Sequence, residues 1–365
     1  MSKPRQQQMQ MQRIKHDELV RMAVEIFVAA GSDAKEAECI AQHLVEANLA
    51  GHDSHGVVRI NRYLGWLRAG QVVPNRHAEI LVDRGASLLI DGGFGYGQVI
   101  GAEAMDLLAA RTAAHGFAVT ALRNSGHLGR IGAWAEHLAK AGYVSVHFVN
   151  SSGLGILVAP HGGSDRRLSA NPIAAGAPVA GGPPLILDMA TSVIAEGKIA
   201  LARNKKEQLP AGYILDGAGR PTTDPETFYA EPRGAILPFG GHKGSGLSVF
   251  CEILAGSLTG GFSSHPGNPT AKRLVNNMLS LAFDPAAFAG TGFLHADIER
   301  LIAWTKASPP IEPGGSVLLP GEIEQRVRQD RLANGIPIDP ETWAQIRAAA
   351  AAIGVTVPHH PGAAS

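Results

Sequence analysis

The sequence of 365 residues contains no apolar run of the roughly 18 residues that a membrane-spanning helix needs. Its first residues also lack the apolar core of a secretory signal. Met1 to Lys15 is rich in Gln, Met and Arg, and a disordered lead is expected over residues 1–14. The only two cysteines, Cys39 and Cys251, lie in helix-like apolar patterns that are typical of buried thiols in a reducing compartment. A cytoplasmic protein without membrane attachment is expected.

The chain has no excess of either charge. It carries 32 basic and 32 acidic residues and no basic patch, which argues against a nucleic-acid partner. Its length allows one large domain or two to three smaller ones. The 44 glycines sit between apolar segments, so they indicate tight turns rather than disorder.

Both ends of the chain show apolar residues at helical spacing. Helices are predicted over residues 16–30, from a Ser32 cap to about Ala50, and over residues 57–69. Asp339 followed by Pro340 predicts the start of a last helix. These patterns predict one helical domain built from residues 15–80 and 290–365.

Residues 81–289 alternate short apolar runs with helical patterns, which predicts an α/β or α+β domain. The strand–helix–strand order favours parallel pairing. The predicted strands are SLLIDGG, FAVTALRNS, YVSVHFVNS, PLILDMATS, GAILPFGG and NMLSLAFDP. The predicted helices cover residues 98–114, 131–141, 193–204, 246–260 and 296–307.

The stretch GFGYGQVIG, residues 93–101, looks like a dinucleotide-binding fingerprint because it follows a predicted strand and opens a helix. Its spacing is wrong, however, and no acidic residue follows about twenty positions on to bind a ribose. His115 and Gly116 stand there instead. The stretch is therefore interpreted as a tight turn into a helix.

The stretch GHDSHGVVR, residues 51–59, gathers proton-transfer and anion-binding groups after a helix end. His55 titrates near working pH, and the Arg59 guanidinium can hold a carboxylate with two hydrogen bonds. If a helix starts near Gly56, the i, i+4 spacing puts both side chains on one face. Ser54 could bind the same substrate oxygen or cap the helix.

A metal site is the alternative interpretation of this stretch. On a helix, His52 and His55 would share a face, and His127 could supply a third ligand. The sequence has no His-Glu-x-x-His and no Cys-x-x-Cys motif, so no metal is expected. A metal-dependent hydrolase or lyase built on the three histidines stays open beside the main interpretation.

Further polar groups follow predicted strands or lie in glycine-rich turns. His127 lies in RNSGHLGRIG, where Arg130 stands beside a helix start that could bind phosphate. Asp188 ends a predicted strand and could orient an imidazole or cap a turn. His242 and Lys243 lie in GGHKGSGL, and LPGEIE forms a turn before a helix.

Together these motifs resemble the malate/L-lactate dehydrogenase family, which is distinct from the Rossmann-fold lactate dehydrogenases. The resemblance runs from about Ile14 to Gly354 and is most specific for the hydroxycarboxylate dehydrogenase B branch. Its carriers are HDSHGVVR, RNSGHLGRIGAWAE, HFVNSSG, APHGG, SANPIAAGAP, LDMATSVIAEGKI, GGHKGSGLSVFCEILAG and LLPGEIE.

The resemblance implies a homodimeric, NAD- or NADP-dependent oxidoreductase that acts on 2-hydroxy or 2-oxo acids. It implies an α+β fold, in which a helical shell from both chain ends surrounds a central non-Rossmann nucleotide-binding domain over residues 81–289. The sheet of this domain should be largely antiparallel, which replaces the parallel pairing that the local pattern favours.

The resemblance also implies roles for single residues. His55 and His127 are the two candidates for the proton donor, and Arg59 binds the substrate carboxylate. Ser151 and Asn171 line the substrate site. The nucleotide-contacting positions are Gly129, Arg130, Ile131, Ile186, Leu187, Asp188, Met189, Ala190, His242, Lys243, Gly321, Glu322, Ile323 and Glu324.

The chain departs from the family pattern in two places. SANP stands where many members have TNP, and APHGG stands where many have APYGG. His161 therefore adds a titratable group to the predicted substrate pocket. The sequence predicts hydride transfer between nicotinamide C4 and substrate C2, with His55 favoured over His127 as the proton donor.

Overall fold

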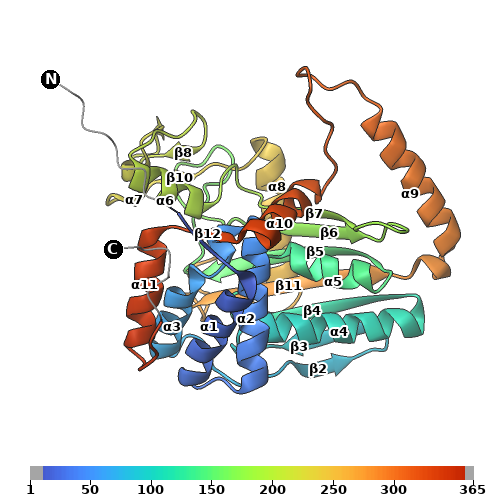
Figure 1. Ribbon diagram of the computed structural model, residues 1–365, viewed down its shortest axis with the longest axis horizontal. Helices are drawn as coiled ribbons and strands as arrows, with labels where there is room; N and C mark the ends of the chain where they lie inside the picture. The colour runs from blue at the N-terminus through green and yellow to red at the C-terminus, as the bar shows by residue number, and fades with distance from the viewer. Residues whose placement is uncertain (1–10, 358–365) are drawn as a thin grey trace. The chain divides into compact units, whose positions relative to one another are not determined.

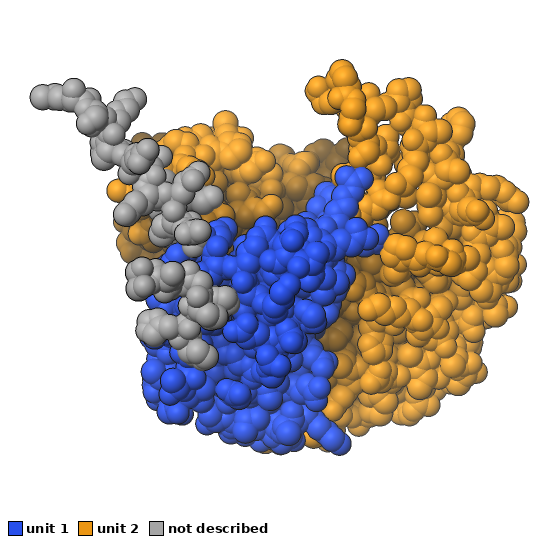
Figure 2. Space-filling view, viewed as in Figure 1, with its two compact units in different colours: residues 1–75, 323–365 blue, residues 76–322 orange. Residues whose placement is uncertain are grey.

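The computed structural model describes residues 11–357 and divides into two compact units (Figure 2). The helical unit comprises residues 1–75 and 323–365, and the sheet unit comprises residues 76–322. The sequence predicted the boundaries between residues 80 and 81 and between residues 289 and 290. Residues 290–322, which include α9 (Thr291–Lys306), belong to the sheet unit.

The helical unit is assembled from both ends of the chain. Its elements are β1 (Gln12–Ile14), α1 (His16–Ala29), α2 (Ala34–Leu49), a 3-10 helix (Asp53–His55), α3 (Arg59–Arg68), α10 (Glu322–Asn334, whose first residue belongs to the sheet unit), β12 (Ile336–Ile338) and α11 (Pro340–Ala351). Disorder was expected over residues 1–14, but residues 12–14 pair with β12 as an antiparallel strand. The pairing is stabilised by the complete burial of Ile14. Residues 1–10 of the predicted lead lie outside the described part of the chain.

Of two helix caps that the sequence predicted, one is present and one is wrong. Asp339 caps α11 by accepting a hydrogen bond from the Thr342 backbone N–H at 2.8 Å, as its sequence predicted. The predicted Ser32 cap of α2 is wrong. Asp33 is the cap, accepting from the Glu36 N–H at 2.8 Å, whereas the Ser32 hydroxyl donates to the Glu36 carboxylate at 2.6 Å.

The sheet unit is built on a seven-stranded sheet (Figure 1). In spatial order its strands are β2 (Glu79–Asp83), β3 (Ser87–Asp91), β4 (Phe117–Ser125), β11 (Leu274–Phe283), β5 (Val144–Gly153), β6 (Ile173–Ala177) and β7 (Leu185–Met189). Every neighbouring pair is antiparallel except β3 and β4. The largely antiparallel sheet is therefore confirmed.

The strand–helix–strand order explains the single parallel pair. Helix α4 (Gly97–His115) crosses over between β3 and β4, which pair in parallel. Helix α5 (Gly132–Lys140) makes a similar crossover from β4 to β5, and these strands also run in the same direction. Strand β11 lies between them and pairs antiparallel with both, so the local pattern predicted their direction but not their neighbours.

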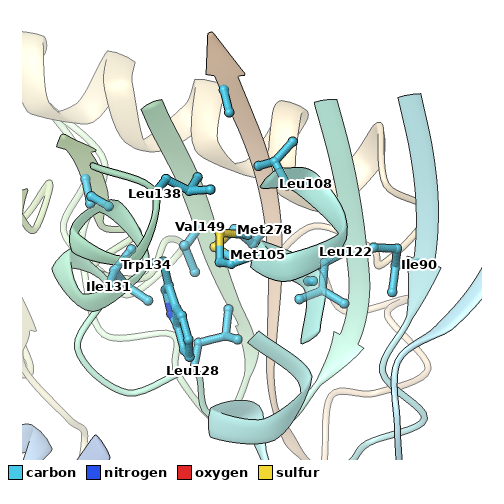
Figure 3. Packing of buried hydrophobic residues seen from close by; sticks show 14 of the residues in the cluster. Ile90, Met105, Leu108, Leu122, Leu128, Ile131, Trp134, Leu138, Val149 and Met278 are labelled. Atoms are coloured by element: carbon cyan, nitrogen blue, oxygen red, sulfur yellow. The ribbon is translucent and has the colours of Figure 1, made fainter. Parts of the chain in front are cut away.

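Helices α4 and α5 pack on this sheet and form its core. Figure 3 shows Met105 and Leu108 of α4 beside Met278 of β11, with Trp134 of α5 nearby. The first three side chains are fully buried, and each contributes roughly 1.5–3 kcal/mol from burial. This packing fixes the start of α5, which the predicted site residues Gly129, Arg130 and Ile131 precede directly.

The remaining elements of the sheet unit lie around a small three-stranded sheet and along the end of β11. They are α6 (Glu196–Lys205), β8 (Ile214–Leu215), β9 (Pro221–Thr222), α7 (Pro225–Tyr229), β10 (Ala235–Ile236), α8 (His242–Cys251), a π-helix (Glu252–Ser257), a 3-10 turn (Pro285–Ala287) and α9. No helix within residues 11–357 has the length and apolar character needed to cross a membrane.

The two cysteines differ in environment. Cys251 is fully buried, and burial raises the pKa of its thiol to about 12, as expected for a structural thiol. Cys39 is only partly buried, which corrects the expectation for that residue. Neither forms a disulfide.

His147 lies inside β5 with no exposed surface. Its ring nitrogens lie 2.8 Å from the Ser280 hydroxyl and 3.0 Å from the Ser145 hydroxyl. Burial lowers the pKa of His147 to about 3, so the ring stays neutral at neutral pH.

Stability is expected to fall as the pH drops from about 6.5 towards 3, because the unfolded chain binds a proton at His147 that the folded chain excludes. Each pH unit in this window removes about 1.4 kcal/mol from this group's contribution to the unfolding free energy. His147→Gln should flatten that part of the pH dependence in urea unfolding, whereas the exposed His115→Gln should not. An unchanged slope in His147→Gln would contradict the assignment.

Candidate active site

The predicted proton donor lies in a short turn of the helical unit. Helix α2 ends before Gly51, whose φ of +84° turns the chain. A 3-10 helix then covers Asp53–His55, and the His55 N–H donates to the His52 carbonyl at 2.9 Å. His55 is half-buried at the end of this turn.

His55 and Arg59 do not share a helical face, contrary to the prediction. Helix α3 begins only at Arg59, and Gly56 is extended with φ −88° and ψ −153°. Ser54 links the two residues instead. Its hydroxyl lies 3.0 Å from His55 Nδ1, and its carbonyl accepts from Arg59 Nε at 2.5 Å.

Asn48 is the buried residue that shapes this turn, and the sequence did not reveal it. Its side-chain oxygen accepts from the Val57 N–H at 2.8 Å, and its amide donates to Asp53 at 2.6 Å. A Cβ on Gly56 would lie only 2.1 Å from this oxygen, so position 56 requires glycine. Asn48 and Gly56 together explain why the chain is extended where a helix was predicted.

Helix α10 supplies partners to the same turn within the helical unit. Arg331 donates to the Asp53 carboxylate through both terminal guanidinium nitrogens, at 2.5 and 2.9 Å. His52 Nε2 lies 3.3 Å from Glu324, a residue that was predicted to contact nucleotide. No group of three or more His, Cys, Asp or Glu side chains within the described residues could hold a metal ion. The three-histidine metal interpretation therefore lacks geometric support.

In the sheet unit, the GFGYG stretch is the tight turn that was predicted, and it holds the His127 loop. The Gly126 N–H donates to the Gly95 carbonyl at 2.9 Å, and Gln98 Nε2 donates to the His127 carbonyl at 3.3 Å. A Cβ on Gly97 would lie 2.3 Å from that carbonyl. These glycines allow close backbone contact with the loop.

Arg130 lies at the start of α5 with 3% of its surface exposed. One guanidinium nitrogen pairs with Glu136 at 2.7 Å. Nε and Nη1 are buried and have no hydrogen-bond partner among the described residues. Two buried guanidinium nitrogens without a hydrogen-bond acceptor are costly unless a bound ligand accepts from them.

Asp188 of β7 is bound to the same helix, because its carboxylate accepts a hydrogen bond from the N–H of Gly132, the first residue of α5, at 2.9 Å. A Cβ on Gly132 would lie 2.9 Å from Arg130 Nη1 and 2.7 Å from Asp188 Oδ2, so Arg130 and Asp188 flank this glycine.

Two of the predicted nucleotide segments lie side by side in the sheet unit. The Ile186 N–H donates to the Pro320 carbonyl at 3.3 Å. A Cβ on Gly321, whose φ is +92°, would lie 3.3 Å from the Ile186 nitrogen. Ile186 is buried, whereas Leu187 is exposed and Asp188 is half-buried. Met189 and Ala190 are also half-buried, and Glu322 pairs with Lys306 at 2.5 Å. Ile323, which belongs to the helical unit, is exposed.

Three further predicted segments converge next to β7. The Thr191 N–H donates to the Ala170 carbonyl at 2.8 Å, and the Phe239 N–H donates to the Thr191 carbonyl at 3.1 Å. This brings the SANP, MATS and GGHKG stretches together. The exposed rings of His161 and His242 meet edge to face, with centroids 5.9 Å apart.

Lys243 is exposed one residue after His242, in the first turn of α8. The backbone N–H of His161 donates to the Ser245 hydroxyl at 3.0 Å, which ties the APHGG loop to the same helix. His161 and Lys243 thus flank His242 in the sheet unit.

Asn171 is completely buried and acts on Ser151 rather than presenting its amide to solvent. Its oxygen accepts from the Ser151 N–H at 3.2 Å, and its amide donates to Glu252 at 2.8 Å. Glu252 also accepts from Asn150 and from the Ser264 N–H and hydroxyl. The sequence missed Glu252 because it lies in the apolar helix pattern SVFCEILAG, where a carboxylate has no local signal.

Residues 14–347 match the malate/L-lactate dehydrogenase family. Hydroxycarboxylate dehydrogenase B of Escherichia coli is 41% identical over 332 residues, which cover 90% of this chain and 91% of that protein. The L-lactate dehydrogenase of Cupriavidus necator is 36% identical over 339 residues, covering 93% and 97%. The structure of malate dehydrogenase from Pyrococcus horikoshii superimposes with a TM-score of 0.85 at 31% identity, covering 95% and 97%.

The chain therefore belongs to the malate/L-lactate dehydrogenase family, which confirms the resemblance seen in its motifs.

Proposed function

We propose that the protein is an NAD- or NADP-dependent oxidoreductase that transfers a hydride between nicotinamide C4 and C2 of a 2-hydroxy or 2-oxo acid. The observation that carries the proposal is the match to dehydrogenases named for hydroxycarboxylate, lactate and malate over about nine-tenths of the chain. Hydroxy-acid oxidation and oxo-acid reduction are the two directions of one reaction.

In the direction of reduction, the substrate oxygen must gain a proton while C2 gains the hydride. We assign His55 as the donor of this proton, and the Ser54 hydroxyl holds its ring at Nδ1. Arg59 holds the substrate carboxylate, and its Nε bond to the Ser54 carbonyl fixes the guanidinium beside the same turn. One short segment then orients both ends of the substrate.

The sheet unit carries residues that fit a dinucleotide. When bound, the nicotinamide supplies or accepts the hydride. Arg130 offers two buried, unpaired N–H donors, which suit the negative charge of a diphosphate. The segments assigned to the cofactor on the family pattern are residues 129–131, 186–190 and 321–324 with His242 and Lys243. The largely antiparallel sheet supports a nucleotide-binding domain of non-Rossmann type.

The direct test follows NADH and NADPH oxidation with a panel of 2-oxo acids. His55→Asn should keep cofactor affinity, measured by fluorescence, but lower kcat by about 10²–10⁴ because the general acid is lost. His127→Asn should act mainly on KM. His52→Asn is the matched control in the same turn and should retain most of kcat.

The pH profile of reduction distinguishes the two candidate donors. His55→Asn should lose the limb that reflects histidine titration, and His127→Asn should retain it. The reverse result would give the proton to His127. Turnover that a chelator abolishes and zinc restores would contradict the proposed reaction.

Arg130→Met should weaken binding of NADH or NADPH by about tenfold or more, because two charge-assisted hydrogen bonds to the cofactor are lost. Arg111→Met is the matched control, because the ion pair of Arg111 with Asp83 is only partly buried. Fluorescence titration measures both variants without turnover. Equal affinities for wild type and Arg130→Met would remove Arg130 from the cofactor site.

We further propose that the protein is a homodimer. Helix α9 stands apart from the sheet in Figure 1 and buries none of its side chains, yet it exposes 61% of Phe293, 57% of Leu301 and 81% of Trp304. Exposed apolar side chains gathered on one helix are typical of an interface. Light scattering should give twice the monomer mass, and Trp304→Glu should shift the protein towards monomer while Arg300→Ala should not. A monomeric wild type would overturn this proposal.

A further inference from the structure

Asn276 joins two elements of the predicted site, although no motif contains it. It lies on β11 between β4 and β5 and is 3% exposed. The register between β11 and β4 shifts between Asn276 and Met278. The side chain contacts the loop that carries His127 on one side and Ser151 on the other.

The chemistry of its partners fixes which way the Asn276 amide faces. The Leu128 backbone N–H lies 2.9 Å from Oδ1, and because this group can only donate, the facing atom must be the amide oxygen. The amide nitrogen then faces Ser151 and donates to its hydroxyl oxygen at 2.7 Å. A backbone group of the His127 loop thus sets the polarity of the contact with Ser151.

The polarity determines what Ser151 offers to a ligand. Since the oxygen of Ser151 accepts from Asn276, the hydroxyl proton must point away from Asn276. The backbone of Ser151 is fixed as well, through its N–H bond to Asn171. We propose that Asn276 is a positioning residue that makes Ser151 a hydrogen-bond donor to an oxygen of the bound 2-oxo acid. This inference rests on the proposed function.

Asn277 provides a matched control on the same strand. It is also fully buried and uses both ends of its amide, accepting from the Asn124 N–H at 2.9 Å and donating to Asn150 at 2.8 Å. Neither of these partners is Ser151 or Leu128. If the substitution of any buried asparagine disturbed the site, Asn276 and Asn277 variants should therefore show the same change in kinetics.

The experiment uses Asn276→Asp, which keeps the shape of the side chain. The carboxylate still accepts from Leu128 but must accept the Ser151 proton instead of donating to it. KM for the 2-oxo acid should rise about tenfold in Asn276→Asp and in Ser151→Ala, with cofactor affinity unchanged. The double variant should be no worse than either single variant.

Comparison of the single and double variants also distinguishes a reversed hydrogen bond to Ser151 from repulsion of the substrate by the new carboxylate. If the new carboxylate acted by repelling the substrate, Asn276→Asp would still raise KM in the Ser151→Ala background, and the proposal would be wrong. Independent effects of Asn276→Asp and Ser151→Ala would overturn it in the same way.

Hydrogen exchange tests the structural basis without turnover. The Leu128 amide should stay protected in Asn276→Asp and exchange at least about tenfold faster in Asn276→Ala, where its buried acceptor is lost. Unchanged protection in Asn276→Ala would overturn the positioning role. Failure of the proposed function has a different signature, because wild type would then reduce no 2-oxo acid in the panel.

Discussion

The pairing of β11 with both β4 and β5 is the interaction on which the sheet unit depends. The strand enters the sheet after more than a hundred residues of intervening chain, and it separates two strands that a local crossover would have left adjacent. Its side chains have two roles. Met278 is part of the apolar core, and Asn276 and Asn277 accept hydrogen bonds from the backbone of neighbouring segments. The position of this one strand therefore determines both packing and polar geometry.

The sequence revealed the features whose causes are local. A proline after an aspartate predicted the start of α11, and apolar runs predicted β4 and β11. The glycines of GFGYG were interpreted as a tight turn because their spacing did not fit a nucleotide loop, and the turn is present. Family motifs then supplied the antiparallel sheet, which no local pattern indicated.

The features that the sequence did not reveal depend on distant partners. Asn48 and Glu252 are polar residues at buried positions of helices, where their spacing predicts only burial. The side chain of Asn48 requires Gly56 to be glycine, and the extended backbone there breaks the helix that would have placed His55 and Arg59 on one face. Glu252 receives hydrogen bonds from Asn171 and Asn150, which lie 81 and 102 positions away in the chain.

The β1–β12 pairing has a consequence for biosynthesis. Gln12 pairs with Ile338, so the helical unit cannot close until almost the whole chain has left the ribosome. The sheet unit lies between the two segments of the helical unit and is complete in sequence at residue 322, so it can fold first. Until the C-terminal segment emerges, β1 lacks its strand partner β12, and α3 lacks α11, which packs against it.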